Sequence, residues 1–114
     1  MKISKPGRII LDPTARADEK DDAATYIAEF EGEKALAPLI QASLNPKEND
    51  IPVLSDYGSA IAELWVKKGI FDLKTYLSLP GDTKGGVFDV LDYKKPAWVK
   101  KYGFYEEGFE PFPD

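Results

Sequence analysis

Four acidic side chains near the start of the chain could hold a divalent cation. Asp18, Glu19, Asp21 and Asp22 fall within the run ADEKDD, and carboxylate oxygens are the ligands that Mg²⁺ and Ca²⁺ prefer. The run lacks the alternating ligands and central glycine of an EF-hand loop. Acidic residues also suit the first turns of a helix, where they meet the positive end of the helix dipole. We therefore expect a helix start here and no metal site.

A glycine-rich segment, GDTKGG at residues 81–86, contains the residue types of a phosphate-binding loop. The order of its residues does not match G-x-x-x-x-G-K-[ST], and no clear strand precedes it. We expect a turn at this place, without a nucleotide and without any other cofactor.

The chain contains no cysteine and no histidine. Thiolate nucleophiles, disulfides and thiolate metal sites are therefore excluded, and the commonest general base near neutral pH is missing. Ser55, Ser59 and Ser78 have no histidine to activate them. The acidic pairs Asp89 with Asp92 and Glu106 with Glu107 show no sign of converging on a cleft, as a catalytic carboxylate pair must. We expect no enzymatic activity and no small-molecule substrate.

Pairs of lysines stand beside aromatic residues at three places: after Trp65, after Tyr93, and between Trp98 and Tyr102. Proteins that bind single-stranded nucleic acid use such combinations, because lysines neutralise phosphates while rings stack on bases. The net charge of −5 and the absence of arginine after Arg16 argue against this interpretation. We do not expect nucleic acid as a partner.

Charge alternates in sign along the chain. Residues 1–20 carry five basic and three acidic groups, residues 21–63 two and nine, residues 64–104 eight and four, and residues 105–114 none and four. Such blocks suit docking of one protein surface on another, or self-association of an acidic surface with a basic one. Solvated helix faces that differ in charge by chance would give the same pattern.

Apolar spacing predicts a chain of short helices. Ala23, Tyr26, Ile27 and Phe30 share one helical face. Further helices are expected within 33–44, where Pro38 should break, kink or start the helix, and within 55–68, 72–77 and 96–101. Residues 84–92 fit a strand or a short helix, and Ile9, Ile10 and Leu11 read as a strand or extended arm after a turn.

These elements predict a mainly α fold, or an α+β fold dominated by helices. We expect a single compact domain over residues 1–114, with four to five short helices, a small β element and extended terminal arms. Its parts would be an N-terminal arm or strand at 1–16, a helical core at 17–102 and an acidic aromatic tail at 103–114. The expected core comprises Tyr26, Ile27, Phe30, Leu39, Ile61, Leu64, Trp65, Leu73 and Leu77.

The sequence Trp-Val-Lys-Lys occurs at residues 65–68 and again at 98–101. The residues before the two copies do not match, so we interpret the copies as two helix ends with the same needs, and not as an internal repeat. In each, lysines meet the negative end of the helix dipole and a glycine follows shortly after. The second copy leads into five aromatics within eleven residues, which would be costly to leave in water.

The leading functional hypothesis is a non-enzymatic structural or assembly subunit that acts through protein contacts, with itself or with another protein. Its concrete form is a small bacteriophage virion component of the head, neck or tail. The expected contact residues are Trp98, Tyr102, Phe104, Tyr105, Phe109, Phe112, Ile9 and Ile10, and the tail could pack on its own domain or on a neighbour.

The alternative is a small acidic inhibitor or immunity-type protein that blocks a basic site on an enzyme. Its acidic face would comprise Glu29, Glu31, Glu33, Glu48 and Asp50. No apolar run approaches the ~20 residues that span a bilayer, and the polar start MKISKPGR lacks the core of a secretory signal. We therefore expect synthesis in the cytoplasm and no membrane insertion.

Overall fold

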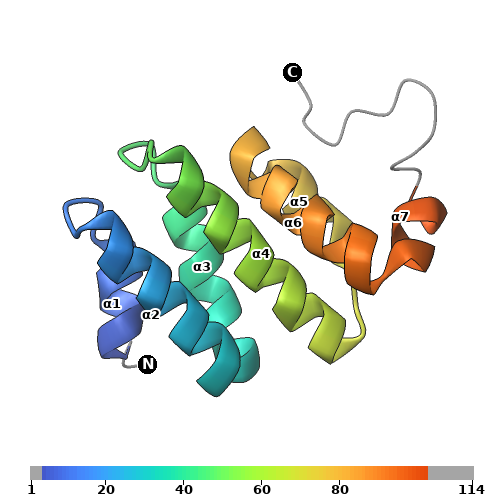
Figure 1. The fold of residues 1–114 in the computed structure, drawn as a ribbon, viewed down its shortest axis with the longest axis horizontal. Coiled ribbons are helices and arrows are strands. Elements are labelled where there is room, and N and C mark those ends of the chain that lie inside the picture. Colours follow the sequence, from blue (N-terminus) through green and yellow to red (C-terminus); the bar gives the residue numbers. More distant parts are fainter. Residues whose placement is uncertain (1–3, 103–114) are drawn as a thin grey trace.

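Local signals in the sequence start and stop most helices of the computed structural model, which describes residues 4–102 (Figure 1). These residues form seven α-helices and one 3₁₀ helix: α1 (Lys5–Leu11), α2 (Ala17–Phe30), η1 (Gly32–Ala35, the 3₁₀ helix), α3 (Leu36–Leu44), α4 (Ile51–Lys68), α5 (Leu73–Ser78), α6 (Gly81–Lys94) and α7 (Pro96–Lys101). The prediction of a compact, helix-dominated domain is confirmed.

Side-chain caps fix three of the helix starts. Ser4, Asp50 and Asp72 each accept a hydrogen bond from a backbone N–H three residues later, at 3.2, 3.1 and 3.1 Å. Such bonds satisfy donors that the first helical turn leaves without a partner. At the other end of α4, Gly69 adopts a left-handed conformation with φ 79°, which glycine reaches without steric cost.

The predicted β element is not present within residues 4–102. Ile9 to Leu11 lie in α1, because the Ser4 cap and Pro6 in the first turn start a helix where the β-branched residues suggested a strand. Val87 to Leu91 lie in α6, which also contains the GDTKGG segment that we expected to be a turn. Within the N-terminal arm or strand expected at residues 1–16, residues 5–11 form α1.

Pro38 does not break the second predicted helix. It is the third residue of α3, where the backbone N–H has no helical partner to lose. The 3₁₀ helix η1 comes directly before α3 and connects it to α2 through Gly32, whose φ is 60°.

The helices form two layers (Figure 1). The longer helices α2, α4 and α6 lie side by side, and the shorter α1, α3 and α5 lie behind them. Neighbours in this first layer run in the same direction, as the progression of colour along α2, α4 and α6 shows (Figure 1).

The packing of α4 against α6 is close enough for the two backbones to touch. A Cβ atom built on Gly58 would lie 1.9 Å from the carbonyl oxygen of Thr83, and one on Gly86 would lie 1.9 Å from that of Ser55. Only glycine leaves room at these two positions. Gly86 therefore serves the packing of α6 on α4 and not a turn.

The core contains only part of the predicted set. Ile27, Leu39, Ile61, Leu64 and Trp65 are buried as expected. The prediction is wrong for four exposed residues, Tyr26, Phe30, Leu73 and Leu77. In α2 the buried face is made by Ala23, Ala24, Ile27 and Ala28, because small side chains allow α1 and α4 to approach.

A buried ion pair attaches the α3–α4 loop to α2. Lys20 Nζ lies 2.7 Å from Glu48 Oε1, and both side chains are only 4% exposed. Lys20 also donates to the carbonyl oxygen of Pro13 at 3.4 Å. Nearby, the hydroxyl of Tyr57 donates to the carbonyl oxygen of Ile10 at 3.4 Å. Burial, with Glu48 among the negative charges nearby, raises the pKa of that hydroxyl.

Candidate functional site

Two of the predicted contact residues, Trp98 and Tyr102, lie in an aromatic cluster centred on Phe71. The ring centroids of Trp98 and Tyr102 are 6.1 and 4.8 Å from that of Phe71. Trp65 and Tyr76 contact the same ring at 5.3 and 5.6 Å. Both tryptophans of the duplicated Trp-Val-Lys-Lys sequence therefore pack on one phenylalanine, from helices α4 and α7 of very different length.

The other predicted contact residues have different outcomes. Phe104, Tyr105, Phe109 and Phe112 lie outside the described residues. Ile9 is partly buried against the core, and Ile10 is only 2% exposed. Ile10 packs within its own domain, so it is not free to contact a partner.

Sequence reasoning missed an apolar surface on α3. The residues Leu36, Ala37, Ile40, Gln41 and Leu44 recur at helical spacing, and all are partly or fully exposed; we call them the α3 face. Leu44 is 47% exposed, and α3 contains no charged residue. A helix of such composition is typically covered on all sides. The absence of charge in LAPLIQASL was the signal that could have indicated this surface.

Two grooves flank the α3 face. The first, the α1–α3 groove, has a volume of about 610 Å³, and its walls include Leu11 and Leu44. The second, the Phe71 groove, has a volume of about 480 Å³, and its walls include Phe71, Ile70 and Leu73. Ala37 and Ile40 line both grooves. Ile70 is 57% exposed, so the apolar surface extends from α1 across α3 to the start of α5.

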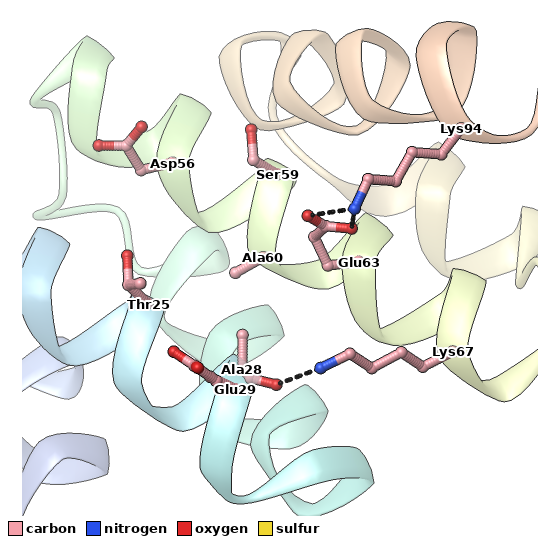
Figure 2. Close-up of a pocket in the computed structure, with 9 residues that line it drawn as sticks. All are labelled: Thr25, Ala28, Glu29, Asp56, Ser59, Ala60, Glu63, Lys67 and Lys94. Carbon is pink, nitrogen blue, oxygen red and sulfur yellow. Dashed lines mark hydrogen bonds and ion pairs between the residues drawn. The ribbon is translucent and has the colours of Figure 1, made fainter.

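A third groove, the α2–α4 groove, is polar (Figure 2). Its volume is about 510 Å³, and its small floor residues Ala28 and Ala60 leave the space open. The walls carry three carboxylates and two lysines: Glu29, Asp56, Glu63, Lys67 and Lys94.

Both lysines of the α2–α4 groove are already engaged. Lys94 Nζ lies 2.7 and 3.0 Å from the two carboxylate oxygens of Glu63, and Lys67 donates to the carbonyl oxygen of Ala28 at 3.5 Å. Glu29 and Asp56 make no ion pair with a described residue. The negative charge of the groove is therefore only partly balanced.

One carboxyl beside this groove has an unusual pKa. Burial of Asp21 raises its pKa to about 6, and a hydrogen bond and like-charge repulsion with Asp56 act in the same direction. The two side chains come from the neighbouring helices α2 and α4, so the raised pKa of Asp21 depends on how these helices pack together.

A desolvated lysine lies beside Tyr76, a member of the aromatic cluster. Lys84 is 5% exposed, its Nζ is 5.9 Å from the ring centroid of Tyr76, and burial lowers its pKa. A lysine of this kind can act as a nucleophile when an electrophile-binding pocket adjoins it. Lys84 lines none of the grooves described above, so none of them places an electrophile beside its amine.

The acidic residues expected to form an inhibitory face do not act together. Glu48 is buried against Lys20, and Glu33 pairs with Lys68. Asp50 caps α4, which leaves Glu29 and Glu31. Among residues 4–102, no group of three acidic side chains is placed to hold a metal ion. No helix within the same range is long and apolar enough to cross a membrane.

Comparison with known proteins finds no matching family, no similar characterised protein and no similar solved structure.

Proposed function

We propose that this chain is a non-enzymatic assembly protein that binds a protein partner, including further copies of itself, through the α3 face. The observation that carries the proposal is an uncharged helix that presents Ile40 and Leu44 between two apolar grooves. Covering such side chains gains about 25 cal/mol for each Å² removed from water. A helix or loop of a partner would fill the α1–α3 groove and lie along α3.

The proposed setting is a larger particle, such as the head, neck or tail of a bacteriophage. Support comes from the small helical domain, the alternating blocks of charge and the uncharged face. In such a particle, apolar contact would supply affinity, while charged blocks would orient neighbouring subunits.

Sedimentation velocity and light scattering over a concentration series would test the proposal. We expect the mass to rise above the 12.7 kDa monomer with concentration. Leu44→Lys should leave a monomer, because it places a charge on the α3 face. The matched control is Tyr93→Lys, which changes a residue 84% exposed on α6 and should assemble like the unmodified chain.

A strict monomer would refute the proposal if it persisted to ~1 mM, where an association of about −4 kcal/mol would already be populated. Assembly that Leu44→Lys leaves intact would also refute it, since contact would then be made elsewhere. Circular dichroism of each variant would confirm that the helices are retained.

The α2–α4 groove supports a second candidate, the inhibitor that blocks a basic site. Its carboxylates Glu29 and Asp56 have no cationic partner among the described residues. This function would require a monomer that binds an oligolysine peptide in a salt-sensitive manner. Asp56→Asn should weaken that binding, whereas Glu33→Gln, outside the groove, and Leu44→Lys should not. Equal weakening by Asp56→Asn and Glu33→Gln would indicate general charge attraction and exclude a specific site.

A further inference from the structure

The described part of the chain ends at the edge of the Phe71 groove. Tyr102 is its last residue, and its ring centroid is 4.8 Å from that of Phe71. Phe71 is itself a wall of the groove, together with Leu36, Ile40, Ile70 and Leu73. The next twelve residues, GFYEEGFEPFPD, therefore start beside an apolar groove with exposed walls.

The chemistry of these twelve residues complements the groove. They contain Phe104, Tyr105, Phe109 and Phe112, and four acidic residues without a basic one. Residues 64–102 carry eight lysines and four aspartates, a net charge of +4. Lys68 lines the groove and pairs with Glu33, and the carboxylate of Asp72 is engaged in capping α5 through Thr75.

We propose that residues 103–114 occupy the Phe71 groove of their own chain, with aromatic side chains against Ile70 and Leu73. Twelve residues can extend about 40 Å, so the groove is within reach. Attachment at Tyr102 gives the segment an effective concentration in the millimolar range at the groove. A second copy has no such advantage at micromolar concentration, which favours the chain's own segment as the occupant.

This occupancy has a consequence for the whole apolar surface. The segment would cover Ile70 and Leu73 and leave the α1–α3 groove open. A partner docking along α3 would then contact both Leu44 and the edge of the bound segment. The inference concerns the Phe71 groove alone, so its test does not depend on the assembly role examined with Leu44→Lys.

A spin label near the end of the full-length chain would test the inference. The sequence has no cysteine, so Pro113→Cys creates a single attachment site for a nitroxide. We expect the backbone amide signals of Ile40, Ile70 and Leu73 in the nitrogen-15 NMR spectrum to lose most of their intensity. The signals should recover when the label is reduced. Amides of α2 on the opposite layer should keep their intensity.

Two further samples separate the possible occupants. In the first, nitrogen-15 chains without a label are mixed with labelled chains that carry no nitrogen-15. The inference predicts no loss of signal in this mixture, whereas loss at the Phe71 groove would identify a second copy as the occupant and overturn it. In the second sample, Ile70→Lys is added to the labelled chain, with Tyr93→Lys as the matched control. The signal loss should disappear with Ile70→Lys and persist with Tyr93→Lys.

Full intensity at the groove in the labelled chain would overturn the inference. Loss that persists with Ile70→Lys would also overturn it, because the segment would then lie near the groove without binding in it. Both substituted residues are exposed, so the fold should tolerate the changes, and the dispersion of the NMR spectrum would verify this in the same samples.

Discussion

Replacing Gly58 by alanine should destabilise the protein, although alanine is the better helix former. The added Cβ would lie 1.9 Å from the carbonyl oxygen of Thr83 and 2.8 Å from its carbon. Carbon and oxygen rarely approach closer than about 3.3 Å, so α6 would have to move by about 1.4 Å. A backbone carbonyl cannot rotate away as a side chain can. The cost should therefore reach about 3 kcal/mol, at the upper end for an overpacked site.

The helix propensity of alanine offsets about 1 kcal/mol of this cost. A net loss of about 2 kcal/mol is expected, a large share of the 5 to 15 kcal/mol typical of a domain. Urea unfolding followed by circular dichroism would measure it. Gly85→Ala is the matched control, because Gly85 shares its side of α6 with the exposed Asp89 and Asp92. It should be neutral or stabilising by up to about 1 kcal/mol.

The double variant Gly58→Ala and Gly86→Ala sharpens the test. Since each glycine faces the backbone of the other helix, the first alanine would already separate α4 from α6. The two costs should then sum to less than their separate values. If Gly58→Ala unfolds at the same urea concentration as Gly85→Ala, the backbones are not in contact and the packing argument is wrong.

Three further predictions concern groups with unusual surroundings. The pKa of Asp21 is raised to about 6 beside Asp56, so the folded state holds this proton more tightly than the unfolded state. The protonated carboxyl therefore contributes its full share to the free energy of unfolding below pH 3.8. This contribution is lost as the pH rises through about 6. Asp21→Asn should thus stabilise the protein by about 1 kcal/mol at pH 7, after allowance for solvent screening, and change little at pH 3.5; equal gains in urea unfolding at both values would contradict this. Lys20→Met should cost about 3 kcal/mol in urea unfolding because it leaves Glu48 buried and unpaired, and Glu48→Leu in the same chain should recover most of the loss; no recovery would mean that the charge of Glu48 is not the cause. Phe71→Ala should cost about 3 kcal/mol and shift the tryptophan fluorescence of the folded protein, whereas an unchanged emission spectrum would contradict the central place of this ring.

The parts of the fold that follow from local interactions were accessible from the sequence. The stripe of α4 and its glycine stop were predicted, and both are present. The strand expected at Ile9 was wrong, because β-branched residues favour strands only weakly. Ser4 caps a helix here instead, by accepting a hydrogen bond from the backbone of Gly7. Periodicity also placed Tyr26 in the core, yet it is half exposed. Helical spacing shows which residues share a face of a helix, but packing against the neighbouring helices decides which face is buried.

The candidate surfaces were less predictable than the helices. Trp98 and Tyr102 were chosen from the sequence as contact residues, and their packing on Phe71 was not foreseen. The α3 face was missed because its residues resemble an ordinary core stripe. Their exposure depends on the position of α3 at the back of the domain, with no described helix over its outer side (Figure 1).

The sequence by itself determined the chemistry that this protein lacks and the places where most helices begin and end. Without cysteine and histidine, the chain has no thiol and no imidazole group in any conformation. A helix cap is equally local, because its hydrogen bond joins atoms only a few residues apart. Only the tertiary structure decided that Gly58 and Gly86 bring two backbones together, that both tryptophans share Phe71, and that no helix within residues 4–102 covers the outer side of α3. Such contacts join residues far apart in the chain. The hydrogen bond from Tyr57 to the carbonyl oxygen of Ile10, for example, joins residues 47 positions apart. Their energies depend on distances that no local pattern of residues specifies.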